Sequence, residues 1–84
     1  MSSTAPEIIK AYVLISVSLG KTKEAIKNLK QITNITSVAV ITGEYDVIVR
    51  IETSSINDLY NCVQEIHLID GIIDTTTSII QKEI

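Results

Sequence analysis

Apolar and polar positions along the chain follow two different periods. Four segments are runs of β-branched and apolar residues, which is the composition of strands. Two further segments place apolar side chains every three or four positions, the spacing along one face of a helix. The predicted order is strand, helix, strand, strand, helix and strand, over residues 11–18, 21–32, 35–42, 46–53, 55–67 and 72–81.

This order of elements predicts an α+β fold of the ferredoxin-like kind, β-α-β-β-α-β. Its crossovers would place both helices on one face of a four-stranded antiparallel sheet. Eighty-four residues suffice for one such domain. We expect residues 1–10 to be a flexible lead-in and residues 11–84 to form the domain. Thr22 and Ser55 are the predicted caps of the two helices.

Alternation within the strands separates a covered face of the sheet from an open one. Val13 and Ile15 would point toward the helices, whereas Tyr12 and Leu14 would point away from them. Ile48 falls on the same open face. A contiguous apolar face is uncommon on a monomer and usually marks an interface. The sequence therefore predicts a homodimer that uses Tyr12, Leu14 and Ile48.

Composition narrows the classes of function. The net charge of −3 does not favour a nucleic-acid binder, which needs a basic footprint to neutralise phosphates. No apolar run reaches the roughly 18 residues of a membrane span, and the first ten residues do not resemble a signal peptide. With a single cysteine, the chain cannot form an internal disulfide. We expect a soluble cytoplasmic protein.

No catalytic arrangement stands out in the sequence. His67 is the one histidine and is interpreted as a structural or surface residue. Cys62 lies beside the apolar stripe of its predicted helix, where a small buried side chain fits better than a nucleophile. Without a cluster of histidines or cysteines, we predict no metal site and no cofactor. The expected protein is not an enzyme.

The most distinctive stretch is Gly43-Glu44-Tyr45-Asp46, in which a predicted three-residue link, 43–45, leads into the third strand at Asp46-Val47-Ile48-Val49. Glycine gives a turn there its backbone freedom, and a turn aspartate often accepts backbone N–H groups. In the last strand, Thr75 and Thr77 share one face. From the residues alone, these positions could contact a ligand, or they could only shape the hairpin and the sheet.

Together these segments resemble the C-terminal regulatory domain, or RAM domain, of the Lrp/AsnC family of feast/famine transcription regulators. Gly43 and Asp46 fit the family's Gly-x-x-Asp hairpin signature, and Thr75 and Thr77 fit its Thr-x-Thr strand. The resemblance implies a domain that dimerises through its sheets, assembles further, and binds amino acids or related metabolites between dimers. The ligand-binding residues that it implies are Gly43, Glu44, Tyr45, Asp46, Thr75 and Thr77.

Members of that family carry an N-terminal helix-turn-helix, whereas residues 1–10 are too few for one. We therefore expect a stand-alone effector domain without direct DNA binding, which could assemble with a full-length regulator. Two alternatives share the fold class, and fold alone cannot separate them. One is a small ferredoxin-like enzyme, although residues 18–21 lack the arginine of an acylphosphatase loop. The other is an ACT-like or structural oligomerisation subunit.

Overall fold

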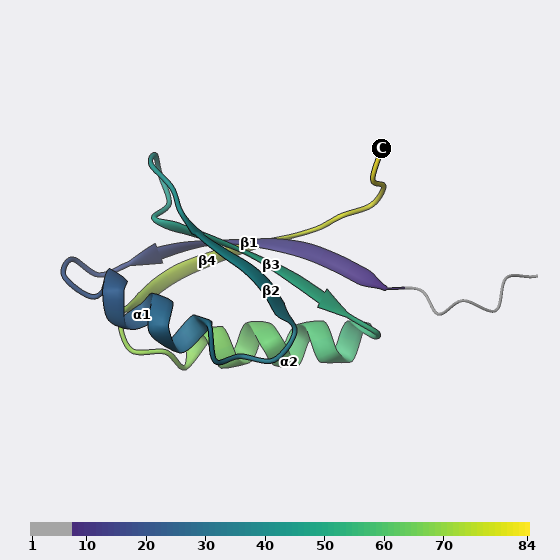
Figure 1. The fold of residues 1–84 in the computed structure, drawn as a ribbon, viewed down its shortest axis with the longest axis horizontal. Coiled ribbons are helices and arrows are strands. Elements are labelled where there is room, and N and C mark those ends of the chain that lie inside the picture. Colours follow the sequence, from purple (N-terminus) through teal and green to yellow (C-terminus); the bar gives the residue numbers. More distant parts are fainter. Residues whose placement is uncertain (1–7) are drawn as a thin grey trace, which may run out of the picture.

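The computed structural model describes residues 8–84 and contains the predicted elements in the predicted order (Figure 1). The first strand begins at Ile9, so the end of the expected lead-in belongs to the sheet, while residues 1–7 lie outside the described part. The elements are β1 (Ile9–Val17), α1 (Thr22–Leu29), β2 (Ile35–Val40), β3 (Val47–Thr53), α2 (Ile56–His67) and β4 (Ile72–Ile79).

The four strands form one antiparallel sheet in the order β2-β3-β1-β4. Both helices lie against the same face of this sheet, and the C-terminal segment rises on the opposite side (Figure 1). The predicted ferredoxin-like α+β fold is confirmed. Neither helix of residues 8–84 combines the length and the apolar character that crossing a membrane requires.

The core lies between the sheet and the helices, as the alternation of the strands predicts. In β1, Val13 and Ile15 are fully buried and stand opposite Val49 and Val47 of β3. Burying such side chains contributes roughly 1.5–3 kcal/mol each, so this aliphatic layer dominates the stability of the fold. The helices complete it with Ala25, Leu29, Leu59, Cys62 and Ile66.

The two helices begin in different ways. The Ser55 side chain accepts a hydrogen bond from the Asp58 N–H at 3.1 Å, which confirms the predicted cap of α2. The predicted Thr22 cap is wrong, because Lys21 occupies the N-cap position of α1 and makes no side-chain cap bond. Gly20, with a φ of +82°, turns the chain so that Thr22 is already the first helical residue.

The link between β2 and β3 is longer than the three residues expected. Pairing of these strands ends at Val40 and Val47, which leaves residues 41–46 as the link. The Ile41 N–H still donates to the Asp46 carbonyl at 2.9 Å, so the link is closed at its base. Gly43 has a φ of +126°, a conformation that other residues adopt only with strain.

Candidate functional site

Asp46 fastens the β2–β3 link to the end of β1. Its Oδ2 atom accepts a hydrogen bond from the Val17 N–H at 2.8 Å, and its own N–H donates to the Ile15 carbonyl at 2.9 Å. Val17 lies beyond Ile15, which is the last β1 residue paired with β3. The carboxylate therefore takes the place of a carbonyl that the neighbouring strand no longer supplies.

Tyr45 joins the same link to the far edge of the sheet. Its hydroxyl lies 2.8 Å from the Thr76 hydroxyl in β4. Thr76 stands opposite Leu14, so this contact is on the face of the sheet that the helices leave open. Because β1 lies between β3 and β4, the tyrosine side chain reaches across β1.

Thr75 and Thr77 lie on the other face. They stand opposite Ile15 and Val13, whose side chains are buried beneath the helices. The Thr75 hydroxyl lies 2.7 Å from Nε2 of His67, at the end of α2. His67 is thus at the surface, as interpreted from the sequence, and it contacts one of the predicted site residues.

The predicted ligand-binding residues therefore gather at one end of the sheet but on both of its faces. Asp46 and Thr75 flank β1 from opposite sides, two strand spacings apart, which is about 10 Å. Gly43 and Glu44 are exposed at the tip of the link. Tyr45 lies over the open face, whereas the two threonines face the helices. One copy of the chain does not enclose a small molecule with this set.

A cavity of about 330 Å³ lies on the helix side, lined by Val63, Gln64 and His67 of α2. Sequence reasoning did not identify Gln64 or this cavity. The available signal was the helical spacing, since residues 63, 64 and 67 share one face of a helix. That spacing does not show whether a neighbouring strand covers the face, so only the tertiary structure reveals the cavity.

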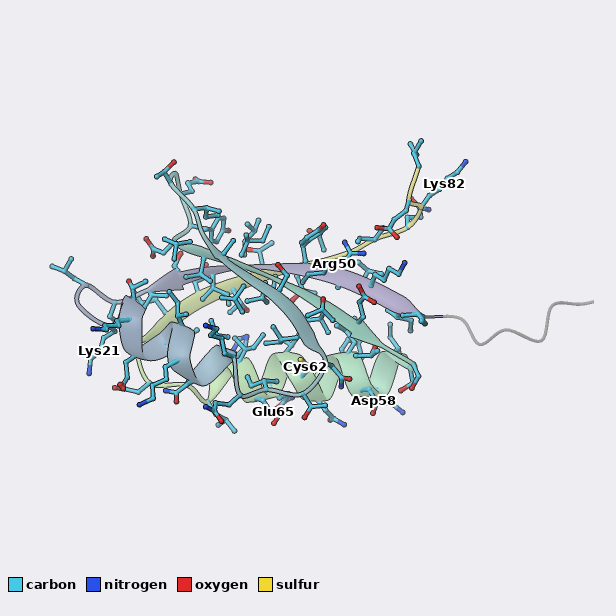
Figure 2. All side chains as sticks on the ribbon, in the orientation of Figure 1. Lys21, Arg50, Asp58, Cys62, Glu65 and Lys82 are labelled. Carbon is cyan, nitrogen blue, oxygen red and sulfur yellow. The ribbon has the colours of Figure 1, made fainter. Side chains whose placement is uncertain are left out.

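The open face carries the predicted dimer residues and a cluster of charges. Tyr12 stands opposite Arg50, and Leu14 stands opposite Ile48, so the three predicted residues do share this face. Figure 2 shows Arg50 on the side of the sheet away from the helices. Its guanidinium bonds to Glu52, Glu83 and the Tyr12 hydroxyl at 3.0, 2.9 and 2.8 Å.

The charged groups of this cluster pair with one another. Hydrogen bonds to Glu52, Glu83 and Tyr12 raise the pKa of Arg50. Bonds from Lys10 and Arg50 lower the pKa of Glu83, so that carboxylate is ionised at neutral pH. Arg50 also lies over the Tyr12 ring, 5.3 Å from its centroid. Half of the open face is therefore ionic and the other half, around Leu14 and Ile48, is apolar.

Cys62 lies between α2 and the sheet, as its interpretation as a small core residue predicts (Figure 2). Burial and the nearby Glu65 raise the pKa of its thiol to about 11, so the sulfur is protonated at neutral pH. A protonated buried thiol is a poor nucleophile and a poor metal ligand. Among residues 8–84, no three side chains of His, Cys, Asp or Glu come together as a metal site.

Comparison with known proteins agrees with the motifs and the topology. The family model of the Lrp/AsnC ligand binding domain matches residues 10–84. The chain belongs to the Lrp/AsnC ligand-binding domain family. A curated relative, the HTH-type transcriptional regulator FL11 of Pyrococcus horikoshii, is 36% identical over 72 residues, which are 86% of this chain and 48% of that protein. The chain thus spans about half the length of FL11.

Two further matches differ in how much of the other chain they cover. The crystal structure of FFRP-DM1 matches with a TM-score of 0.81 and 32% identity, covering 86% of this chain and 97% of that one. The homocitrate synthase of Sulfurisphaera tokodaii is 28% identical over 79 residues, which are 93% of this chain but 17% of the enzyme. The match to the enzyme is therefore confined to a short part of it.

The fold also occurs in a regulator crystallised with an amino acid. The transcriptional regulator NMB0573 of Neisseria meningitidis, in complex with L-methionine, superimposes with a TM-score of 0.76 at 22% identity, covering 90% of this chain and 51% of that one. At this identity the likeness concerns the Lrp/AsnC domain fold alone.

Proposed function

We propose that this chain binds an amino acid or a closely related metabolite at sites that are completed where copies of the chain meet. Membership of the Lrp/AsnC ligand-binding family is the observation that carries the proposal. The geometry supports it, because Tyr45 and the pair Thr75 and Thr77 lie at one end of the sheet on opposite faces. A second copy would supply the missing wall.

The proposed residues suit a zwitterion. An ammonium group needs oxygen acceptors, and a carboxylate needs N–H or O–H donors. Asp46 uses one carboxylate oxygen on the Val17 N–H and can accept further bonds, and Glu44 adds an exposed carboxylate. Thr77 offers an exposed hydroxyl on the strand next to β1. The chain's own part is to bind and orient the ligand, and we propose no catalytic step.

We further propose that two copies associate through their open sheet faces. Tyr12 is 38% exposed, and Leu14 and Ile48 are partly exposed beside it. Covering these side chains with a second copy would remove apolar surface from water. Occupancy of the ligand site could then change the assembly, because the Tyr45–Thr76 contact lies on this same face.

The ligand-binding role is tested by a thermal-shift screen against the twenty amino acids, followed by calorimetry on those that raise the melting temperature. We expect at least one stabilising ligand, with native mass spectrometry showing it bound to an oligomer. Thr77→Val keeps the shape of the side chain and deletes its hydroxyl, so it should weaken binding several-fold. If no amino acid binds, the proposed function is wrong. If Thr77→Val binds equally well, the threonine serves only the sheet.

We propose that the chain acts on DNA only through a partner, by mixed assembly with a full-length cytoplasmic regulator. The net charge of −3 supports this, because phosphate binding needs a basic surface. In a gel-shift assay at 150 mM salt, the isolated protein should not retard DNA, but it should change the mobility of the complex that an FL11-type regulator forms with DNA. A sequence-selective shift by the protein alone would contradict the proposal.

A second candidate function is regulation of an enzyme. The match to a short part of homocitrate synthase supports it, because a stretch of an enzyme is similar to most of this chain. On this alternative, the chain would bind its amino acid and associate with an enzyme subunit in place of a DNA-binding regulator. Copurification from the source cells, with identification of the captured subunit by mass spectrometry, separates the two candidates.

A further inference from the structure

The cavity on the helix side has the size and position of a subsite for a small molecule. Its volume of about 330 Å³ is at the lower end of the roughly 300–1,000 Å³ that is usual for ligand pockets, which suits a metabolite rather than a nucleotide. Gln64 and His67 are exposed along it, and Val63 is half-buried. The cavity is therefore open to solvent and has an apolar wall.

His67 connects this cavity to the proposed ligand site. It lines the cavity, and its Nε2 atom lies 2.7 Å from the hydroxyl of Thr75. Thr75 in turn stands opposite Ile15, whose carbonyl accepts the Asp46 N–H on the other side of β1. A ligand held near the threonines would thus have the cavity beside it.

The lining determines which chemical groups the cavity can satisfy. The Gln64 carboxamide both donates and accepts hydrogen bonds, and the His67 ring offers Nδ1 to a ligand because its Nε2 already contacts Thr75. No carboxylate, ammonium or guanidinium belongs to the three lining residues, and Glu65 points to the side of α2 away from the sheet (Figure 2). A cationic side chain would find no counter-charge here. A wholly aliphatic one would cover the Gln64 amide without pairing it and would leave the His67 ring with only its contact to Thr75.

We propose that this cavity receives the side chain of the bound amino acid and selects a neutral hydrogen-bonding group, above all a carboxamide. The inference rests on the proposed function and adds its substrate class. Gln64 and His67 are the specificity-determining residues, and Val63 packs against the methylene groups of the ligand. The zwitterionic end of the ligand remains with the threonines of this copy and with the link of a second copy, because Asp46 and Thr75 of one chain lie on opposite sides of β1.

The test is calorimetry of the full chain with L-glutamine, L-asparagine, L-methionine and L-lysine. Wild type should bind one of the two amides about tenfold more tightly than methionine or lysine, as expected for one or two hydrogen bonds. Gln64→Met keeps the length of the side chain and should remove this preference. His67→Leu should do the same, and His67→Gln should restore part of it. Gln31→Met replaces an exposed glutamine outside the cavity and should change nothing.

The outcomes separate this inference from the proposed function. If wild type binds an amino acid and Gln64→Met leaves the ranking of the four ligands unchanged, the cavity is not the specificity pocket, while the proposed function stands. A preference for methionine or lysine in wild type also overturns the inference alone. If none of the twenty amino acids binds, both are overturned. Circular dichroism melts of each variant show whether a change in affinity reflects the site or the fold.

Discussion

Replacing Leu14 with aspartate is expected to separate the chain into monomers. Leu14 lies in the apolar half of the open face, opposite Ile48 of β3 and Thr76 of β4. A second copy on this face would bury the new carboxylate without a partner, which costs several kcal/mol. We expect the dimer dissociation constant to rise at least a hundredfold, equivalent to about 3 kcal/mol. Sedimentation velocity across micromolar concentrations measures it.

A matched control introduces the same charge outside the proposed interface. Leu19 lies in the turn between β1 and α1 and is fully exposed, so Leu19→Asp should leave the assembly unchanged. Circular dichroism should show both variants folded, because neither side chain belongs to the buried core. A wild-type monomer at micromolar concentration, or a Leu14→Asp variant that still dimerises, would contradict an interface through the open face.

Asp46→Ala is expected to lower both stability and ligand affinity. Its carboxylate accepts the Val17 N–H at 2.8 Å, and hydrogen bonds to charged groups contribute roughly 1.5–3 kcal/mol. The substitution leaves this N–H without its acceptor and frees the link at the end of β1. Urea unfolding without ligand should show the loss of stability, and calorimetry should show weaker binding of the amino acid.

Asp46→Asn separates the two roles of this side chain. Asparagine keeps an oxygen that can accept the Val17 N–H, but it loses the negative charge that would face a ligand ammonium. Stability should therefore return largely to the wild-type value, while ligand affinity stays reduced. If Asp46→Ala unfolds at the same urea concentration as wild type, the carboxylate does not hold the link. If Asp46→Asn binds ligand normally, the aspartate acts only on the loop.

The order of elements and the buried face of each strand could be predicted from the sequence. Alternation along β1 and β3 assigns Val13, Ile15, Val47 and Val49 to the core, because successive side chains of a strand point to opposite faces. The start of α1 differs from the prediction. Thr22 has the residue type of a cap, yet the turn through Gly20 brings it inside the helix, and this depends on the path of the chain rather than on local preference.

The candidate site, too, could be predicted from the sequence only in part. Gly43, Asp46, Thr75 and Thr77 could be grouped as a candidate site because their order along the chain resembles the Lrp/AsnC motifs. The contact of Tyr45 with Thr76 across β1 could not be predicted. It depends on the order and register of the strands, which no local sequence pattern determines.

The sequence by itself determined the fold class and the motifs, because the periods of strand and helix and the turn residues act over short distances. Only the tertiary structure decided which groups meet. The contact of His67 with Thr75 and the cavity beside Gln64 arise where the end of α2 packs against an edge strand. The Asp46–Val17 bond joins residues 29 positions apart. Such contacts depend on how whole elements pack, so periodicity within one segment cannot reveal them.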